Sequence, residues 1–224
     1  MKKVFIFDMD GVIIDTQGLH SQAAQQALAE FGVQVTFDEV QAYAGTAGVM
    51  VYHELAQRYG KQIPLDEVLA RKQKIFTGLM VNLEREGKFL PIDGIPALLK
   101  ELQAKHIPTA IASSSSDAFI AQVVDTLKLR PYFQALLSGR DLPHSKPDPA
   151  IYLLAAKTLG VAPQEAVVLE DAGMGVLAAK RAGAYCIGFR NPNSGQQDLS
   201  RADEIVHSIR EINVQKLFAR EEKK

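Results

Sequence analysis

A single cysteine, Cys186, occurs among the 224 residues of the sequence. A lone cysteine excludes an internal disulfide framework and is typical of proteins in a reducing compartment. Because Cys186 lies in the strand-like run AYCIGF (184–189), we expect a buried and unreactive thiol. The sequence also lacks a cluster of histidine and cysteine that would indicate a zinc site.

An excess of charge of one sign is missing as well, since 25 Lys and Arg residues balance 26 Asp and Glu residues. A nucleic-acid-binding surface usually brings a basic excess, so nucleic acid is not an expected partner. No apolar stretch approaches the length that crosses a membrane. Asp8 and Asp10 interrupt the first apolar run too early for a signal peptide. These features predict a cytoplasmic protein without a membrane partner, with a monomer as the default.

From about residue 90 onward, strand-like and helix-like segments alternate. The expected helices cover residues 94–106, 117–129, 149–160 and 175–183, and the expected strands cover 107–112, 133–138, 166–170 and 184–189. With Val4–Phe7 as a first strand, this alternation predicts an α/β fold. The expected architecture is a doubly wound, Rossmann-like parallel sheet with helices on both faces.

Residues 16–86 break this alternation. Four helical patterns follow one another there without a convincing strand between them, at residues 20–32, 37–45, 49–60 and 64–86. We therefore expect a helical domain of residues 16–86, inserted into a core domain of residues 1–15 and 87–224.

Polar residues follow the expected strands at the points where they end. Asp8, Asp10 and Gly11 follow the first strand, Ser113 to Ser116 the second, Lys146 the third, and Glu170 and Asp171 end or follow the fourth. Ligands of open parallel sheets bind at the carboxyl ends of the strands. We therefore expect four acids, a cluster of hydroxyls and one lysine at the same edge of the sheet.

These residue types suit a phosphate ester and a cation. Buried carboxylates are costly unless they are paired or bind a metal, and Mg²⁺ prefers carboxylate, phosphate and water oxygens. Asp8 and Asp10 are two residues apart, so both can face one site, and Gly11 lets the backbone turn sharply. Hydroxyls before a helix, together with Lys146, offer donors to an anion.

Two of these features also have a structural interpretation. Ser114 with Asp117 has the spacing of a capping box, so one serine is expected to cap the helix that follows. Gly173 and Gly175 resemble a fragment of a nucleotide-binding turn, which alone is a weak signal. We expect these glycines to allow close packing of a helix on a strand.

Four motifs occur in order along the chain, namely FDMDGVIIDT, ASSSS, SKPDPAIY and VVLEDAGMGVLAAKRAGA. Together they closely resemble the haloacid dehalogenase superfamily of phosphotransferases. Within it, they are most similar to the β-phosphoglucomutase-like branch, which includes many sugar-phosphate phosphatases. The resemblance covers nearly the whole chain and implies that residues 16–86 form the small α-helical cap domain of that superfamily.

The resemblance implies a catalytic role for two aspartates. Asp8 would be the nucleophile that attacks phosphorus and forms an aspartyl-phosphate. Asp10 would be the general acid for the leaving alcohol and then the general base for the attacking water.

The resemblance also implies the ligands of the phosphate and the metal. Ser113 and Lys146 would bind the transferring phosphoryl group, with Ser114 and Ser115 as further phosphate contacts. Asp8, the backbone carbonyl of Asp10, and Asp171 would hold Mg²⁺. Glu170 would be a fourth ligand or a partner of the ligands.

Two residues of the insertion match positions at which this branch contacts its substrate. His20 on an amphipathic helix is otherwise typical of a surface or packing residue. Lys72 lies beside Arg71 and Lys74, which equally indicates a solvated helix face. The resemblance implies that His20 and Lys72 are substrate-binding residues of the cap.

The sequence departs from the mutase pattern at two places. The segment AGTAGVM (44–50) lacks the arginine with which the mutase holds a second phosphate, and Ser116-Asp117 stands where the mutase has Lys-Asn. These differences favour a Mg²⁺-dependent phosphomonoesterase that acts on a small phosphorylated metabolite such as a sugar phosphate. A β-phosphoglucomutase-type phosphomutase is the alternative. A non-enzymatic phospho-accepting module like a response-regulator receiver is a remote one, because a receiver is shorter and has no cap.

Overall fold

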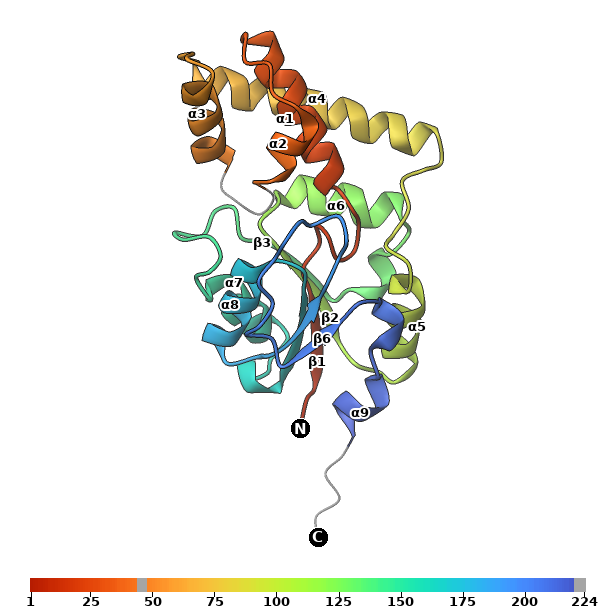
Figure 1. The fold of residues 1–224 in the computed structure, drawn as a ribbon. Coiled ribbons are helices and arrows are strands. Elements are labelled where there is room, and N and C mark those ends of the chain that lie inside the picture. The colour runs from red at the N-terminus through yellow and green to blue at the C-terminus, as the bar shows by residue number, and fades with distance from the viewer. Residues whose placement is uncertain (44–47, 220–224) are drawn as a thin grey trace. The chain divides into compact units, whose positions relative to one another are not determined.

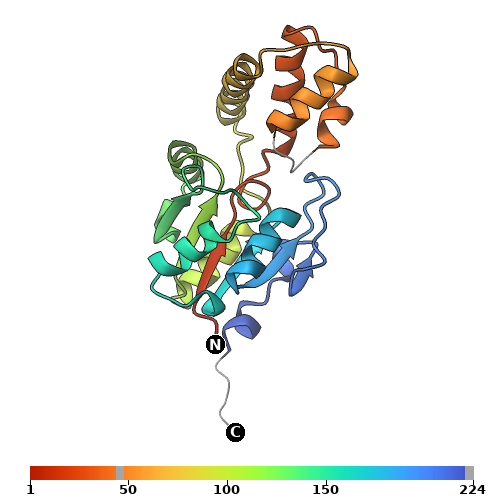
Figure 2. The same cartoon turned by 90° about the vertical axis from the view of Figure 1, so that its left-hand side faces the viewer.

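The computed structural model describes residues 1–43 and 48–219, and the chain divides into two compact units (Figures 1 and 2). The core unit comprises Met1–Asp15, Pro91–Pro192 and Gln196–Lys224. The helical unit comprises Thr16–Leu90 and Asn193–Gly195. Residues 87–90, which the sequence interpretation gave to the core, group with the helical unit. The role of the helical unit as a cap stays a prediction.

The core unit contains a six-stranded sheet in the order β3-β2-β1-β4-β5-β6. Its strands are β1 (Val4–Phe7), β2 (Thr109–Ser113), β3 (Ala135–Ser138), β4 (Ala166–Glu170), β5 (Tyr185–Phe189) and β6 (Glu204–Val206). All neighbouring strands are parallel. The chain winds outward from β1 first through β2 and β3 and then through β4 to β6. This confirms the predicted doubly wound, Rossmann-like α/β fold.

Helices cover both faces of this sheet. They are α5 (Ile95–Ala104), α6 (Asp117–Thr126), α7 (Ala150–Thr158), α8 (Gly173–Ala182) and α9 (Val214–Phe218), with short 3-10 helices η1 (Arg130–Tyr132), η2 (Pro163–Glu165) and η3 (Ile209–Glu211). Helices α7 and α8 lie on one face and α5 on the other (Figure 1). Coverage on both sides explains why the central strands are continuous apolar runs, because neither face meets water.

The alternation of side chains along β1 determines which groups face α7 and α8. Val4 and Ile6 belong to a buried cluster with residues of both helices. Phe5 and Phe7 point to the opposite face, where their ring centroids are 4.6 Å apart. Each such fully buried side chain stabilises the fold by about 1.5–3 kcal/mol. Asp8, next in the alternation after Ile6, is therefore directed toward the face of α7.

The register of the central strands brings acids from different parts of the chain level with one another. Phe7 pairs with Leu169 of β4, and the N–H of Asp8 donates to the carbonyl of Leu169 at 3.0 Å. Glu170 therefore follows beside Asp8. Because Ala166 and Val168 pack in the cluster with α7 and α8, Glu170 is directed to the same face by the same alternation.

The helical unit contains α1 (Gln17–Glu30), α2 (Phe37–Gln41), α3 (Gly48–Arg58) and α4 (Leu65–Arg85). Its own hydrophobic cluster includes Leu28, Leu55 and Val68, one from each of three helices. A capping box of Thr36 and Glu39 begins α2. The helix expected at 37–45 ends earlier, and residues 44 and 45 lie outside the described residues, as does most of the segment without the mutase arginine.

Most expected elements of the core are confirmed, with shifted ends. Strand β2 begins at Thr109 rather than residue 107 because Pro108 has no N–H to donate, although its carbonyl accepts from Phe5. Strand β6 and helix α9 were not predicted, since each is only a few residues long. Within residues 1–43 and 48–219, no helix combines the length and apolar character that a membrane crossing requires. Cys186 is fully buried as expected, and burial raises the pKa of its thiol.

Candidate active site

Lys146 links two acids at the carboxyl edge of the core sheet. Its Nζ donates to Oδ1 of Asp8 at 2.5 Å and to Oε1 of Glu170 at 2.6 Å. All three side chains are at least 88% buried, since the exposed fractions are 12% for Lys146, 10% for Asp8 and 1% for Glu170. Burial disfavours the charged lysine, but the two carboxylates outweigh burial and raise the pKa of Lys146. The lysine therefore stays charged.

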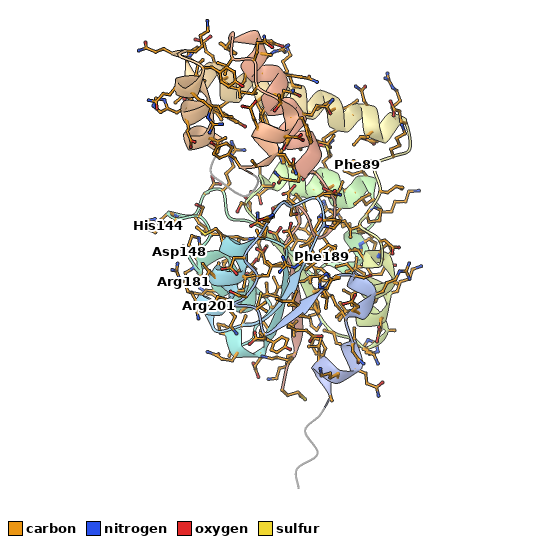
Figure 3. All side chains as sticks on the ribbon, viewed as in Figure 1. Phe89, His144, Asp148, Arg181, Phe189 and Arg201 are labelled. Atoms are coloured by element: carbon orange, nitrogen blue, oxygen red, sulfur yellow. The ribbon has the colours of Figure 1, made fainter. Side chains whose placement is uncertain are left out.

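The two residues that follow Lys146 are held by contacts with α8 and α7. The backbone carbonyl of Pro147 accepts a hydrogen bond from Arg181 of α8 at 2.9 Å. Asp148 accepts from the N–H of Ala150, the first residue of α7, at 2.9 Å. Arg181 and Asp148 are labelled in Figure 3. These contacts fix the backbone on which the lysine is mounted.

Asp10 lies against the serines that follow β2. Oγ of Ser115 donates to Oδ2 of Asp10 at 2.8 Å, and Oγ of Ser113 lies 3.5 Å from the same oxygen. The N–H of Ser115 donates to Oγ of Ser113 at 3.0 Å, so the two serines form a local turn. Ser114 is exposed, and the phosphate contacts expected of Ser114 and Ser115 stay predictions.

The predicted capping box was wrong. Ser116, rather than Ser114, caps α6, and its side chain accepts from the N–H of Phe119 at 3.4 Å. The helix begins at Asp117, so a box starting at Ser114 lies two residues too early. Ser116 therefore caps α6, whereas Ser113 and Ser115 contact Asp10.

Glu170 accepts hydrogen bonds on both of its oxygens. Besides Lys146, the hydroxyl of Tyr152 donates to Oε1 at 2.5 Å. The N–H groups of Asp171 and Ala172 donate to Oε2 at 3.1 and 3.2 Å. A Cβ atom at Gly175 would come within 1.8 Å of Oε1, so this glycine makes room for the carboxylate. Gly175 therefore allows the close helix–strand packing that was expected, and the group that it accommodates is the carboxylate of Glu170.

Gly11 makes room for the other acid that follows β4. Its φ of +84° is in the left-handed region, which confirms the sharp turn expected at this position. A Cβ atom there would lie 2.0 Å from Oδ2 of Asp171. The carbonyl of Gly11 accepts from the buried side chain of Asn191 at 2.9 Å. The turn after β1 thus packs against the acid that follows β4 and accepts a hydrogen bond from the segment after β5.

The acids of this site fit a divalent cation. Asp8, Glu170 and Asp171 each offer a carboxylate oxygen, and these three oxygens lie within 4.8 Å of one another. All three residues are buried, and Lys146 is the cation paired with two of them. An oxygen donor set with surplus negative charge is what Mg²⁺ prefers.

The pKa of Asp8 also favours a divalent cation at this site. Burial raises the pKa of Asp8 well above its ordinary value, and Lys146 opposes that shift. The carboxylates of Glu170 and Asp171 raise the pKa further. A divalent cation among these acids reverses the local balance and favours the ionised carboxylate.

His20 and Lys72 contact each other within the helical unit. Nζ of Lys72 lies 2.8 Å from Nδ1 of His20, and the His20 ring stacks on Phe76 with the centroids 4.1 Å apart. Lys72 and Phe76 are four residues apart on α4 and therefore lie on one helix face. The structure thus brings together the two residues that the sequence singled out, and their contact with substrate stays a prediction.

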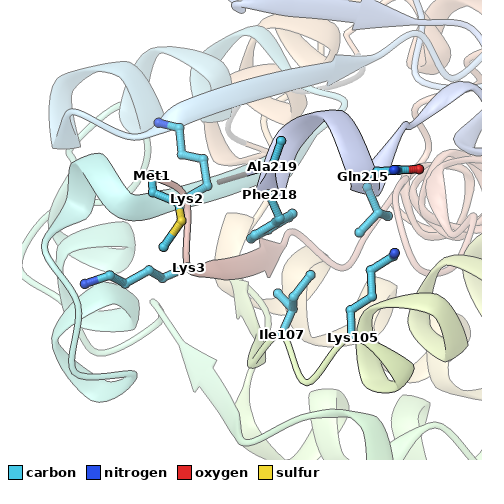
Figure 4. Close-up of a pocket in the computed structure, with 9 residues that line it drawn as sticks. Met1, Lys2, Lys3, Lys105, Ile107, Gln215, Phe218 and Ala219 are labelled. Atoms are coloured by element: carbon cyan, nitrogen blue, oxygen red, sulfur yellow. The ribbon is translucent and has the colours of Figure 1, made fainter. Parts of the chain in front are cut away.

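A groove of about 380 Å³ lies beside the amino ends of β1 and β2, at the other end of the sheet (Figure 4). Its lining consists of Met1, Lys2, Lys3, Lys105, Ile107, Val214, Gln215, Phe218 and Ala219. Lys3 pairs with Glu165 at 2.6 Å, and Lys2 donates to the carbonyl of Gln164 at 2.8 Å. The groove lining offers no carboxylate, so the acids and Lys146 identify the carboxyl edge as the candidate active site.

Sequence reasoning missed two residues of this site. Tyr152 belongs to the apolar face of α7, so its hydroxyl was not recognised as a partner of Glu170. Asn191 follows β5, and nothing in its sequence context indicates the contact with Gly11. Ser115 was predicted as a phosphate contact, and only its hydrogen bond to Asp10 was not foreseen.

A doubly wound sheet with buried acids and a lysine at its carboxyl edge defines the class of α/β enzymes that act on anionic substrates. Residues 5–189 match the family described as haloacid dehalogenase-like hydrolase, and the chain belongs to that family. The predicted superfamily and the prediction of an enzyme are confirmed, and a non-enzymatic receiver module does not fit.

Three individual proteins illustrate the similarity. The chain is 28% identical to validoxylamine A 7'-phosphate phosphatase of Streptomyces hygroscopicus subsp. limoneus, over 95% of this chain and 96% of that protein. CbbY of Rhodobacter sphaeroides, solved as a mutant with xylulose-(1,5)bisphosphate, has a TM-score of 0.76 and 26% identity, covering 95% of this chain and 97% of that one. β-Phosphoglucomutase from Clostridium difficile shares the fold, with a TM-score of 0.79 and 23% identity over 97% of this chain and 96% of that one.

Proposed function

We propose that this chain is a Mg²⁺-dependent phosphomonoesterase that hydrolyses a small phosphorylated metabolite through an aspartyl-phosphate on Asp8. The observation that carries the proposal is the contact of Lys146 with Asp8 at 2.5 Å, inside a buried group of acids. An ammonium at that place draws an anionic ester to the carboxylate that attacks it.

Asp8 would attack phosphorus while the bond from phosphorus to the ester oxygen breaks. Asp10 would give its proton to the departing alcohol and then take a proton from the water that cleaves the aspartyl-phosphate. Inorganic phosphate is released, and both aspartates return to their starting states. Ser115, 2.8 Å from Asp10, keeps that carboxyl oriented during both proton transfers.

The phosphoryl oxygens would be held by Lys146 and by Ser113, which is fully buried at the end of β2. Asp8, Asp171 and the backbone carbonyl of Asp10 would hold Mg²⁺, and Glu170 belongs to the same group of acids. The cation, when bound, supplies charge that shields the anionic nucleophile from the anionic phosphate.

The substrate that best fits is a sugar phosphate. One similar protein is named validoxylamine A 7'-phosphate phosphatase, and another, CbbY, was solved with a sugar bisphosphate. We assign the helical unit the role of a cap and give His20 and Lys72 the role of substrate contacts within it. We expect the enzyme to work as a monomer in the cytoplasm, where a lone buried cysteine stays reduced.

Hydrolysis is favoured over mutase chemistry by the sequence of two segments. Residues 44–50 contain no arginine for a second phosphate, and Asp117 adds a negative charge at the start of α6. A bisphosphate intermediate would therefore be bound poorly, and water would be the acceptor of the phosphoryl group.

The test is phosphate release from a panel of phosphorylated metabolites, measured with Mg²⁺ and with EDTA. β-Glucose 1-phosphate is included, and formation of glucose 6-phosphate is followed in parallel. We expect metal-dependent phosphate release from one or a few sugar phosphates and no release by Asp8→Asn. Conversion of glucose 1-phosphate without phosphate release would instead establish a mutase, and wild-type rates for Asp8→Asn would refute Asp8 as the nucleophile.

A further inference from the structure

Tyr152 carries a hydroxyl into an otherwise apolar part of the core unit. It lies on α7, is 1% exposed and packs in the cluster beneath α7 and α8. A phenylalanine would fill nearly the same space, so packing alone does not explain the hydroxyl. A buried hydroxyl needs a partner, and this one donates to Oε1 of Glu170 at 2.5 Å.

This contact completes the set of donors around Glu170. The N–H groups of Asp171 and Ala172 hold Oε2, while Tyr152 and Lys146 share Oε1. Donors on both oxygens fix the rotation of the carboxylate as well as its position. Because Tyr152 lies on α7, its hydroxyl ties Glu170 to that helix, whereas the two N–H groups belong to Glu170's own chain segment.

The position of Glu170 in turn determines where Lys146 lies. The ammonium is held between Oε1 of Glu170 at 2.6 Å and Oδ1 of Asp8 at 2.5 Å. A shift of Glu170 therefore moves Lys146 relative to Asp8. The ring of Tyr152 is also 5.1 Å from Nζ of Lys146, within the range of a cation–π contact.

We infer that Tyr152 is a positioning residue: its hydroxyl anchors Oε1 of Glu170, and Glu170 holds the ammonium of Lys146 against Asp8. The catalytic consequence of this arrangement rests on the proposed function, in which Asp8 is the nucleophile. With both oxygens engaged by N–H and O–H donors, Glu170 serves Lys146, and a metal ion depends mainly on Asp8 and Asp171.

Tyr152→Phe tests this role, and Tyr185→Phe is the matched control. Tyr185 of β5 also donates its hydroxyl to a glutamate, Glu204, at 3.3 Å, but it has no contact with Asp8 or Lys146. Each variant therefore removes one hydroxyl from a tyrosine–glutamate pair of the core unit. The probe substrate is 4-nitrophenyl phosphate with Mg²⁺, supplemented by the best ester from the metabolite panel.

We expect Tyr152→Phe to lower kcat about ten-fold, as for loss of one hydrogen bond to a charged group that acts in the transition state. KM and the Mg²⁺ concentration for half-maximal activity should stay close to those of the wild type, while the melting temperature should fall by only a few degrees, since the lost hydrogen bond also stabilises the fold. Tyr185→Phe should keep the wild-type kcat. A purely structural role for Tyr152 would lower the melting temperature without this selective loss of kcat.

Crystal structures of the wild type and Tyr152→Phe provide a readout that needs no activity. In the variant, Glu170 should rotate or Lys146 should lose its contact with Asp8. The inference is overturned if both contacts of Lys146 persist, if kcat is unchanged, or if Tyr185→Phe loses as much activity. Wild-type inactivity on the probe and the whole panel would count against the proposed function alone, because the two crystal structures still decide the positioning role.

Discussion

The carboxylate of Asp171 occupies the space beside Gly11 that a side chain would need. A Cβ atom at position 11 would come within 2.0 Å of Oδ2 of Asp171. The sharp turn after β1 and the acid after β4 are therefore dependent on each other. A larger residue at position 11 displaces a proposed metal ligand without altering any acid.

We expect Gly11→Ala to raise the Mg²⁺ concentration for half-maximal activity about ten-fold, because Asp171 must move. Gly32→Ala is the control, since Gly32 has a similar φ of +81° and nothing within 4 Å of its Cβ position. Both variants should lose about 1 kcal/mol of unfolding free energy from the left-handed backbone. Equal Mg²⁺ requirements in the two variants would contradict the link between Gly11 and Asp171.

Ser115 and Ser114 should respond differently to substitution. Ser115→Ala removes the 2.8 Å hydrogen bond to Asp10, and we expect kcat to fall about five-fold, as for loss of a single hydrogen bond. Ser114→Ala changes an exposed side chain and should leave kcat unchanged. Steady-state phosphate release by both purified variants checks this. If Ser114→Ala lost more kcat than Ser115→Ala, the result would support the phosphate contact that the sequence predicts for Ser114.

Asp10→Asn should separate substrates by their leaving groups. Loss of a general acid typically costs at least about a hundredfold, and we expect this for a sugar phosphate, whose alcohol leaves only with a proton. The first turnover of 4-nitrophenyl phosphate should be affected much less, because nitrophenolate leaves unprotonated. Rapid-mixing measurements of the first turnover make the comparison. Equal losses for both esters would argue that Asp10 does not donate the proton.

Tyr52 should make the helical unit sensitive to alkaline pH. Burial raises the pKa of Tyr52 to about 12 from an ordinary value of 10.0. A raised pKa favours the protonated folded state, so this stabilisation is present below pH 10 and is lost as the pH rises toward 12. Tyr52→Phe should therefore reduce the fall in stability across this window by about 2 kcal/mol. Urea unfolding of both proteins at pH 9 and pH 11.5 gives the difference.

Lys72→Met tests the proposed substrate contact of the helical unit. We expect KM for a sugar phosphate to rise about ten-fold with little change in melting temperature, because a charged hydrogen bond to the substrate is lost. Lys74→Met is the control, since Lys74 is an exposed residue of the same helix. If both variants keep the wild-type KM, the contact of Lys72 with His20 has a role inside the helical unit only.

Site residues could be predicted from the sequence where their place at the end of a strand determines where they lie in the fold. Asp8, Ser113 and Asp171 end or follow strands, and the carboxyl ends of parallel strands necessarily meet at one edge. Lys146 was expected at the same edge because it follows the third strand, and the superfamily motifs implied its role.

Contacts that depend on the packing of one element against another could not be predicted. Tyr152 contacts Glu170 only because of the way α7 packs on the sheet, which periodicity does not determine. The hydrogen bond from Ser115 to Asp10 depends on the turn after β2, in which the N–H of Ser115 donates to the Ser113 hydroxyl. Strand β6 has three residues, too few for an alternation to be visible.

The central position of β1 has a consequence for biosynthesis. This strand is synthesised before both of its neighbours in the sheet, which begin at Thr109 and Ala166. At typical rates of elongation, roughly ten to thirty seconds separate the synthesis of β1 from that of β4. During this interval an apolar strand has no partner on one or both sides. Nascent chains of this protein should therefore be clients of ribosome-associated chaperones until β4 has emerged.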